Sequence, residues 1–213
     1  MGKSSKLDVL KGIDLTIREG EILAIIGKSG VGKSTFLHIL GALDRPTQGS
    51  VVLDETEFFS MKDADLAIFR NQRIGFVFQF HHLLPEFTAK ENVAMPGLIA
   101  RESPRTAYQR AEALLIEVGL KERMKHKPRE LSGGELQRIA FARSLMNDPV
   151  LVLTDEPSGN LDQHNSDALH ELMWELVRNK NKTFVVVTHN KDLAARADQT
   201  IELYDGRIKT DTG

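Results

Sequence analysis

The sequence contains no cysteine among its 213 residues. This absence excludes disulfide bonds, cysteine-ligated zinc, iron–sulfur clusters and thiol catalysis, and it is compatible with a reducing compartment. Long apolar runs are also missing: the longest are short, such as Ile22–Ile26, whereas a membrane-spanning helix needs about 18 apolar residues or more. The first residues, MGKSSKLDVLKG, lack the apolar core of a signal peptide. We therefore expect any role at a membrane to depend on a partner protein.

The sequence has no excess of charge of either sign. Its 28 Lys and Arg residues nearly balance its 30 Asp and Glu residues, so the formal net charge is −2, and we expect no nucleic acid as partner. With 27% charged and 41% hydrophobic residues, the composition is that of an ordinary globular protein rather than a disordered chain. The length suits one domain over residues 1–213, or one large domain with an insert.

Short apolar runs alternate with amphipathic stretches, which predicts an α/β fold with a mainly parallel sheet covered by helices. The predicted strands are 21–26, 50–53, 74–78, 150–153 and 183–187, followed by a hairpin of 201–204 and 207–209 around an Asp-Gly turn. The predicted helices are 33–40, 63–71, one that starts near 89, one that starts at 104, 134–146 and 163–178. Residues of about 86–128 are helical throughout, and we expect them to form a sub-domain inserted into the α/β core.

A phosphate-binding pattern follows the first predicted strand. The segment Gly27–Ser34, GKSGVGKS, fits G-x-x-x-x-G-K-[ST] between a buried strand and a helix. Its glycines allow backbone N–H groups to surround phosphate oxygens, and the helix start adds positive potential. Lys33 can reach the β- and γ-phosphates, and the Ser34 hydroxyl can take a place on Mg²⁺. The predicted nucleotide-binding residues are Gly27, Lys28, Ser29, Gly30, Val31, Gly32, Lys33, Ser34 and Thr35. The pattern alone does not distinguish ATP from GTP.

Two carboxylates follow another apolar strand, in the sequence LVLTDE. Ligands of doubly wound sheets bind at the carboxyl ends of the strands. Asp155 would then face Mg²⁺, while Glu156 would point at the water that attacks the γ-phosphate. Adjacent carboxylates repel each other, so a nearby cation is needed to keep both ionised, and Mg²⁺ and Lys33 would supply it.

Two further groups each allow two interpretations. Ser132-Gly133-Gly134 precedes a predicted helix, so it is either a plain N-terminal cap or a second anion site. Since the chain has one phosphate loop, a second anion site would close over nucleotide held by another subunit. His189 follows a central strand, where it could cap the next helix or belong to the active site. Apart from His81 and His82, the other histidines (His38, His126, His164 and His170) are interpreted as surface or packing residues.

Six segments stand in the order found in ABC-type ATPases, which this chain therefore resembles. They are Gly27–Ser34, Gln79, Leu131–Glu135, Asp155-Glu156, Gly159–Asp162 and His189. The resemblance implies a P-loop NTPase core with a helical sub-domain and a small antiparallel β part. It also implies an ATPase that forms a head-to-tail homodimer around two ATP molecules, each between one subunit's phosphate loop and the other's Ser132, Gly133 and Gly134.

The resemblance assigns roles to the remaining residues. Ser34, Gln79 and Asp155 would form the Mg²⁺ shell, and Gln79 would also report on a transmembrane partner. Glu156, His189 and Lys33 would be the catalytic residues, with His189 holding the γ-phosphate and the attacking water. The chain departs from the family pattern in two ways. No aromatic residue precedes Lys33 to stack on adenine. Leu136 stands where the family usually has a polar residue, Ser158 stands in place of Thr, and Asn190 stands in place of Asp.

The stretch 78–89, FQFHHLLPEFTA, is unusually apolar for a loop. It either packs between parts of the core or forms a groove for a helix of a membrane subunit. Together with Glu91–Pro96 it is similar to the ATP-binding subunits of lipoprotein-releasing systems. That similarity implies ATP-driven release of lipoproteins from the inner membrane toward the outer membrane, with two integral membrane subunits of the LolC/LolE type and a peripheral position on the cytoplasmic face. The alternatives are a macrolide-export or cell-division system, or a soluble ABC ATPase without a transport role.

Overall fold

The structure, a computed structural model, describes residues 8–159 and 161–209. Its strands are β1 (Ile22–Ile26), β2 (Val52–Leu53), β3 (Thr56–Glu57), β4 (Ile74–Val77), β5 (Leu151–Asp155), β6 (Thr183–Val187), β7 (Gln199–Tyr204) and β8 (Arg207–Ile208). Its α-helices are α1 (Lys33–Leu40), α2 (Asp63–Arg73), α3 (Ala89–Ile99), α4 (Pro104–Glu117), α5 (Gly133–Ser144), α6 (Gln163–Lys180) and α7 (Lys191–Arg196). Short 3₁₀ helices span Phe58–Ser60, Lys121–Arg123 and Pro128–Glu130.

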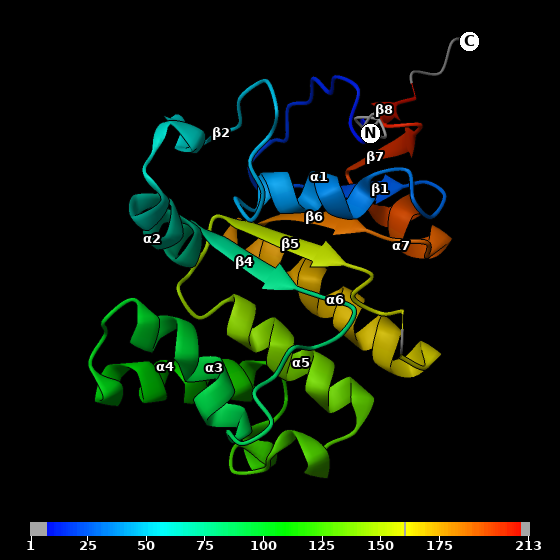
Figure 1. Ribbon diagram of the computed structural model, residues 1–213. Coiled ribbons are helices and arrows are strands. Elements are labelled where there is room, and N and C mark those ends of the chain that lie inside the picture. The colour runs from blue at the N-terminus through cyan, green and yellow to red at the C-terminus, as the bar shows by residue number, and fades with distance from the viewer. Residues whose placement is uncertain (1–7, 160, 210–213) are drawn as a thin grey trace, which may run out of the picture.

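The main sheet has the strand order β4-β5-β6-β1-β7-β8 (Figure 1). Every neighbouring pair is parallel except β7 and β8, which are antiparallel around the predicted Asp205-Gly206 turn. The predicted α/β class with a mainly parallel sheet is confirmed. The four strands β4, β5, β6 and β1 therefore end at the same edge of the sheet.

The small antiparallel sheet pairs β2 with β3. The predicted strand 50–53 was too long, since only Val52–Leu53 is extended and paired, and β3 was not predicted. The two strands are joined by Asp54 and Glu55, which adopt φ angles of 51° and 61°. Tight two-residue hairpin turns need positive φ and usually contain glycine or asparagine. Because this turn contains neither, the sequence pattern offered no signal for it.

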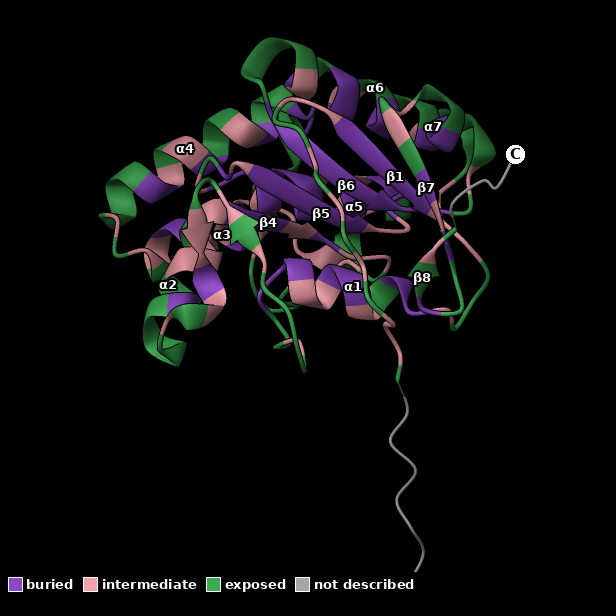
Figure 2. Cartoon of the chain, turned by 90° about the horizontal axis from the view of Figure 1, so that it is seen from above, coloured by how far each residue is buried: buried purple, intermediate pink, exposed green. Residues whose placement is uncertain are grey.

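Both faces of the main sheet are covered by helices (Figure 2). Successive side chains of a strand point to opposite faces, and in the buried strands the side chains on both faces are apolar. In β1, Leu23 and Ile25 pack on the face that α1 covers, together with Phe36 and Leu37. Ile22 packs on the opposite face. That face is covered by α5 and α6, which contribute Ile139, Phe141, Leu169 and Met173. The helices α1 and α5 therefore lie on opposite sides of the sheet (Figure 1).

The helices α3 and α4 pack on α5, on the side of α5 away from the sheet (Figure 1). Both begin where the sequence predicts. Thr88 and Glu91 form a capping box at α3, and the Ser103 hydroxyl caps α4, whose first residue is Pro104. These caps satisfy N–H groups that otherwise have no partner in a helix. That residues of about 86–128 form a separate sub-domain stays a prediction.

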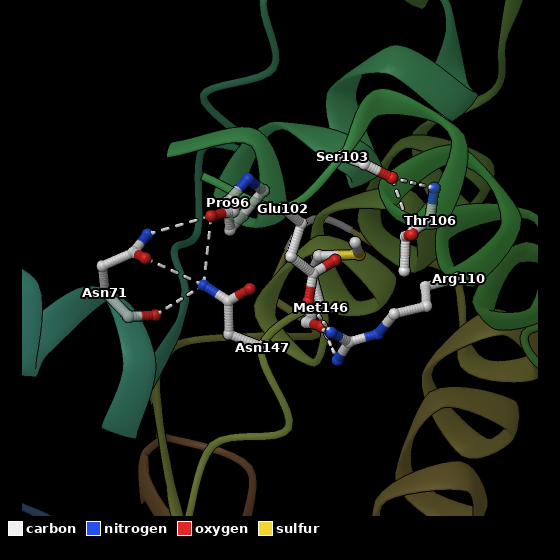
Figure 3. A network of polar contacts seen from close by, with 8 residues as sticks. All are labelled: Asn71, Pro96, Glu102, Ser103, Thr106, Arg110, Met146 and Asn147. Carbon is white, nitrogen blue, oxygen red and sulfur yellow. Dashed lines mark hydrogen bonds and ion pairs between the residues drawn. The ribbon is translucent and has the colours of Figure 1, made fainter. Parts of the chain in front are cut away.

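A cluster of amide groups ties α3 to the α/β core (Figure 3). The Asn147 side-chain nitrogen lies 2.8 Å from the Asn71 carbonyl oxygen, 3.0 Å from its side-chain oxygen and 3.1 Å from the Pro96 carbonyl oxygen. The same view shows the Arg110 guanidinium bonded to Glu102 and to the Met146 carbonyl. The segment after α5 therefore contacts both α3, through Pro96, and α4, through Arg110. Within the described residues, no helix combines the length and apolarity that a membrane crossing requires.

Gly75 in β4 provides a test of how closely the sheet and α5 pack. A Cβ atom there would lie 2.4 Å from the Ser144 carbonyl oxygen, and backbone cannot move aside as a flexible side chain can. We expect Gly75→Ala to destabilise the fold by about 1–3 kcal/mol, the usual range for overpacking. At Gly133 an added Cβ meets no atom within 4 Å. Gly133→Ala should therefore keep the parent's urea midpoint, and equal midpoints for the two variants would contradict the packing described.

Candidate functional site

The predicted phosphate loop leaves the carboxyl end of β1 and enters α1. Gly27, Gly30 and Gly32 have φ angles of 147°, 80° and 104°, which side-chain-bearing residues rarely adopt. A Cβ atom on Gly27 would also lie 2.3 Å from the Leu203 carbonyl oxygen. Gly32 caps α1 without any side-chain hydrogen bond to the helix start. The first N–H groups of α1 therefore have no side-chain cap and suit an anion.

Lys33 places a positive charge inside this loop. Its side chain is buried, and its ammonium group donates to the carbonyl oxygens of Gly27 at 2.7 Å and Lys28 at 2.9 Å. An ammonium group has three N–H donors, so these two bonds leave one for a ligand. The loop thus combines glycine backbone, a helix start and a fixed cation, which together favour a phosphate group.

Ser34 and Asp155 meet beside the loop, although 121 positions separate them in the sequence. The Ser34 hydroxyl donates to the Asp155 carboxylate at 3.1 Å. A hydroxyl and a carboxylate are hard oxygen donors that fit Mg²⁺, which usually takes one or two carboxylates together with phosphate oxygens and water. Among the residues that the structure describes, no three His, Cys, Asp or Glu side chains gather to hold a metal. The Ser34 hydroxyl and the Asp155 carboxylate fit a magnesium ion that is also bound by phosphate oxygens.

Glu156 and His189 face each other at the ends of β5 and β6. The His189 backbone N–H donates to Glu156 Oε2 at 3.2 Å, and His189 Nε2 lies 3.3 Å from Oε1. Oε1 is buried and makes no well-aligned hydrogen bond within the described chain. Glu156 also has a φ of 48°, a strained value for a residue with a side chain.

The surroundings of Glu156 raise its pKa above the ordinary glutamate value, and burial is the main cause. The negative charge of Asp155 raises the pKa further, whereas the His189 N–H bond and the charges of His189 and Lys33 oppose the shift. A residue with a strained backbone and a carboxyl group of raised pKa is typical of functional sites rather than of structural ones.

Gln79 completes the group from the end of β4. A Cβ atom built on Gly159 would lie 3.6 Å from Gln79 Nε2 and 3.5 Å from Glu156 Cβ, so the Gln79 and Glu156 side chains both approach this glycine. The structure therefore brings together the predicted residues of the phosphate loop, Gln79, Asp155, Glu156 and His189. They lie at the carboxyl ends of four adjacent strands, where ligands of such sheets bind.

Ser132, Gly133 and Gly134 lie elsewhere. They begin α5, which lies across the sheet from α1 (Figure 1). Ser132 forms a capping box with Glu135: its hydroxyl accepts from the Glu135 N–H at 3.3 Å, and its own N–H donates to the Glu135 carboxylate at 2.8 Å. Ser132 and Gly133 are exposed. The structure thus shows the N-terminal cap. Because Ser132 and Gly133 are exposed, they could also contact nucleotide held by another subunit, which is the second interpretation.

The segment after Gln79 is held by α5, which the sequence did not indicate. Gln137 bonds to the His81 ring, and the Arg143 guanidinium donates to the carbonyl oxygens of His81 at 2.8 Å and His82 at 2.7 Å. Burial lowers the pKa of Arg143. Phe80, at the start of this segment, remains 70% exposed. Because arginine is usually a surface residue, no sequence signal marked Arg143 as part of the site's support.

The family described as ABC transporter matches residues 10–159 of the chain. The chain belongs to the ABC transporter family. The matched range contains the phosphate loop, Gln79, the Ser132 turn and the Asp155-Glu156 pair, so the resemblance inferred from the sequence is confirmed. His189 lies beyond the match.

Individual members of the ABC transporter family are similar to almost the whole chain. The lipoprotein-releasing system ATP-binding protein LolD of Geobacter metallireducens is 56% identical over 207 residues, which are 97% of this chain and 92% of that protein. Its counterpart in Cytophaga hutchinsonii is 54% identical over 202 residues, 95% of this chain and 92% of that protein.

Two solved structures of the ATP-binding cassette MJ0796 show the same fold. A dimer in a post-hydrolysis state with ADP and Pi has a TM-score of 0.88 and 39% identity, and covers 95% of this chain and 89% of that one. A second dimeric structure has the same TM-score and coverages and 40% identity. These values confirm the predicted ABC-type fold.

The raised pKa of Glu156 predicts how stability depends on pH. A folded-state pKa above the unfolded value of 4.5 means that the charged carboxylate destabilises the fold at neutral pH, and that this penalty disappears once both states are protonated. We expect Glu156→Gln to melt at a higher temperature than the parent at about pH 7.5, and the gain to vanish near pH 4. The exposed Glu175→Gln should show no such gain. A Glu156→Gln variant less stable than the parent at neutral pH would refute the burial penalty.

Proposed function

We propose that the chain is the ATP-hydrolysing subunit of an ABC transporter that releases lipoproteins from the bacterial inner membrane toward the outer membrane. The observation that carries hydrolysis is the Glu156–His189 pair beside the buried Lys33 ammonium and the glycine loop. The observation that carries the cargo is the similarity, above 50% identity over nearly the whole chain, to ATP-binding proteins of lipoprotein-releasing systems.

The phosphates of ATP bind in the loop formed by Gly27–Ser34 and Thr35. The uncapped N–H groups at the start of α1 and the Lys33 ammonium neutralise charge that grows on the γ-phosphoryl oxygens. Ser34, Asp155 and Gln79 would hold Mg²⁺, which when bound would supply further positive charge at the β- and γ-phosphates.

Glu156 orients the attacking water and accepts its proton. The water oxygen forms a bond to the γ-phosphorus, the bond from that phosphorus to the β-phosphate oxygen breaks, and ADP leaves with phosphate as the second product. The raised pKa of Glu156 makes the carboxylate a stronger base than an exposed glutamate. His189 lies within reach of the same carboxylate and holds the γ-phosphate and the water in line.

ATP binding joins two copies of the chain head to tail. The turn of Ser132, Gly133 and Gly134, of which Ser132 and Gly133 are exposed, then covers ATP held by the other copy, because its glycines and helix start suit a second anion. The dimeric structures of the similar cassette MJ0796, one with ADP and Pi, support this arrangement.

Membrane attachment comes through partner subunits. Phe80, Leu84 and Phe87 are 70%, 40% and 39% exposed and lie close together in the sequence, in the segment that follows β4 and Gln79. We assign this apolar patch to a helix of the integral membrane subunits, a LolC/LolE-like pair, which handle the lipoprotein. The chain is then a peripheral protein on the cytoplasmic face of the inner membrane, and no nucleic acid takes part.

Substitutions in the site should separate ATP binding from hydrolysis. Glu156→Gln keeps the loop intact, so it should bind ATP as the parent does, accumulate as a dimer on size-exclusion chromatography with Mg-ATP, and release phosphate at least 100-fold more slowly. Parent-level phosphate release by Glu156→Gln would show that another group activates the water.

The Lys33→Ala variant removes the buried cation, so it should lose affinity for the nucleotide itself, measured by equilibrium binding.

The apolar patch can be tested by capture of membrane subunits. Phe80→Ser should lose co-purification with integral membrane proteins from detergent-solubilised membranes, because the most exposed aromatic ring of the patch is gone. Its ATP binding should stay at the parent level. Ile116→Ser, at a 49% exposed apolar position on α4, is the control and should co-purify normally. Unchanged capture by Phe80→Ser would place the membrane contact elsewhere.

A further inference from the structure

A buried hydrogen bond holds Ser158, two residues after Glu156 in the sequence. The Nε2 atom of His170, on α6, is 3.0 Å from the Ser158 hydroxyl oxygen. His170 is 4% and Ser158 8% exposed, so water does not compete for this bond. Burial lowers the pKa of His170, and the neutral ring can either donate or accept. A polar pair in the core beside a catalytic glutamate is not required for packing, which an apolar pair would supply as well.

Ser158 belongs to two consecutive backbone turns, the first of which begins at Glu156. The Gly159 N–H donates to the Glu156 carbonyl oxygen at 3.1 Å, and the Leu161 N–H donates to the Ser158 carbonyl oxygen at 3.1 Å. Glu156 itself sits at a left-handed φ, a conformation that persists only when its surroundings hold it. A side-chain bond that fixes Ser158 therefore also fixes the direction in which the Glu156 carboxylate points.

His170 is linked in turn to the helix that follows His189. Its ring lies edge-on to the Trp174 ring at 6.2 Å between centroids, and the Arg196 guanidinium on α7 lies 4.3 Å from the Trp174 ring centre. Arg196 also pairs with Glu171 of α6 at 2.7 Å. Since α7 begins two residues after His189, this row of contacts joins the supports of both catalytic side chains.

The charges around His170 come from both helices and leave the ring neutral. Asp167 and Glu171 on α6 and Asp192 on α7 raise its pKa, Arg196 lowers it, and burial outweighs them all. The hydrogen bond to Ser158 is therefore made by a neutral ring, because burial lowers the pKa of His170.

We propose that His170 is a positioning residue for ATP hydrolysis: its bond to Ser158 holds the turn that aims Glu156 at the attacking water. This inference rests on the proposed function, because it acts through Glu156. It goes beyond the interpretation of His170 as a surface or packing residue, since packing alone does not require Nε2.

The test compares steady-state ATP hydrolysis of the full chain with variants that change only the hydrogen bond. His170→Phe keeps a ring of similar size and should lower kcat about tenfold while KM for Mg-ATP stays within about twofold, because binding does not use Glu156. His170→Gln places an amide near Nε2 and should recover at least half of the parent kcat. Ser158→Ala should lower kcat as His170→Phe does, and the double variant should fall no further. His164→Phe, at an exposed position of the same helix, should keep the parent kcat and KM.

Several outcomes would overturn the inference. Parent-level kcat in Ser158→Ala would do so even if His170→Phe fails to fold, because Ser158→Ala removes a single oxygen atom. A multiplicative loss in the double variant, or no recovery with His170→Gln, would show that His170 acts by packing. Parent-level turnover in Glu156→Gln would instead overturn the proposed function itself, so the two failures are distinguishable.

Discussion

The parallel alignment of four neighbouring strands is the constraint on which the site depends. β4, β5, β6 and β1 are adjacent and run the same way, so each ends at one edge of the sheet. Gln79, Asp155, His189 and the phosphate loop each follow one of these strands. No single motif needs to bind ATP and activate water by itself, because backbone hydrogen bonds between strands place groups from distant parts of the sequence within a few ångströms. The Ser34–Asp155 bond across 121 positions is one result.

The site is built at a cost to stability. Gly27 has a backbone conformation that other residues avoid, Glu156 is held at a positive φ, and the Glu156 carboxylate is partly desolvated beside Asp155. Each feature opposes folding locally, yet each suits chemistry on a triphosphate. These groups stand at the ends of the buried apolar strands β1, β5 and β6, whose packing offsets the local cost.

Local signals explain how much of this was predictable from the sequence. The phosphate loop, the caps at Thr88 and Ser103 and most strands and helices follow from residue spacing within short windows, and the order of motifs indicated the family. Contacts between distant side chains left no such signal. The bonds from Arg143 to the His81 and His82 carbonyls and from His170 to Ser158 depend on tertiary packing. The Asp54-Glu55 turn adopts left-handed angles with side chains that do not favour them, so its strand β3 was missed.

The grip of α5 on the segment after Gln79 has a mechanical consequence. The helix has 12 residues and is therefore a stiff rod of about 18 Å. Gln137 bonds to the His81 ring and Arg143 to the His81 carbonyl oxygen, next to the exposed Phe80, while Ser132 and Gly133 at the start of the helix are exposed. A helix of this length moves as a unit when the segment bound to Gln137 and Arg143 is displaced. Under the proposed function, a membrane helix that displaces the segment after Gln79 would therefore also move the Ser132 turn, and the same short helix would connect a partner in the membrane to a nucleotide bound by another copy.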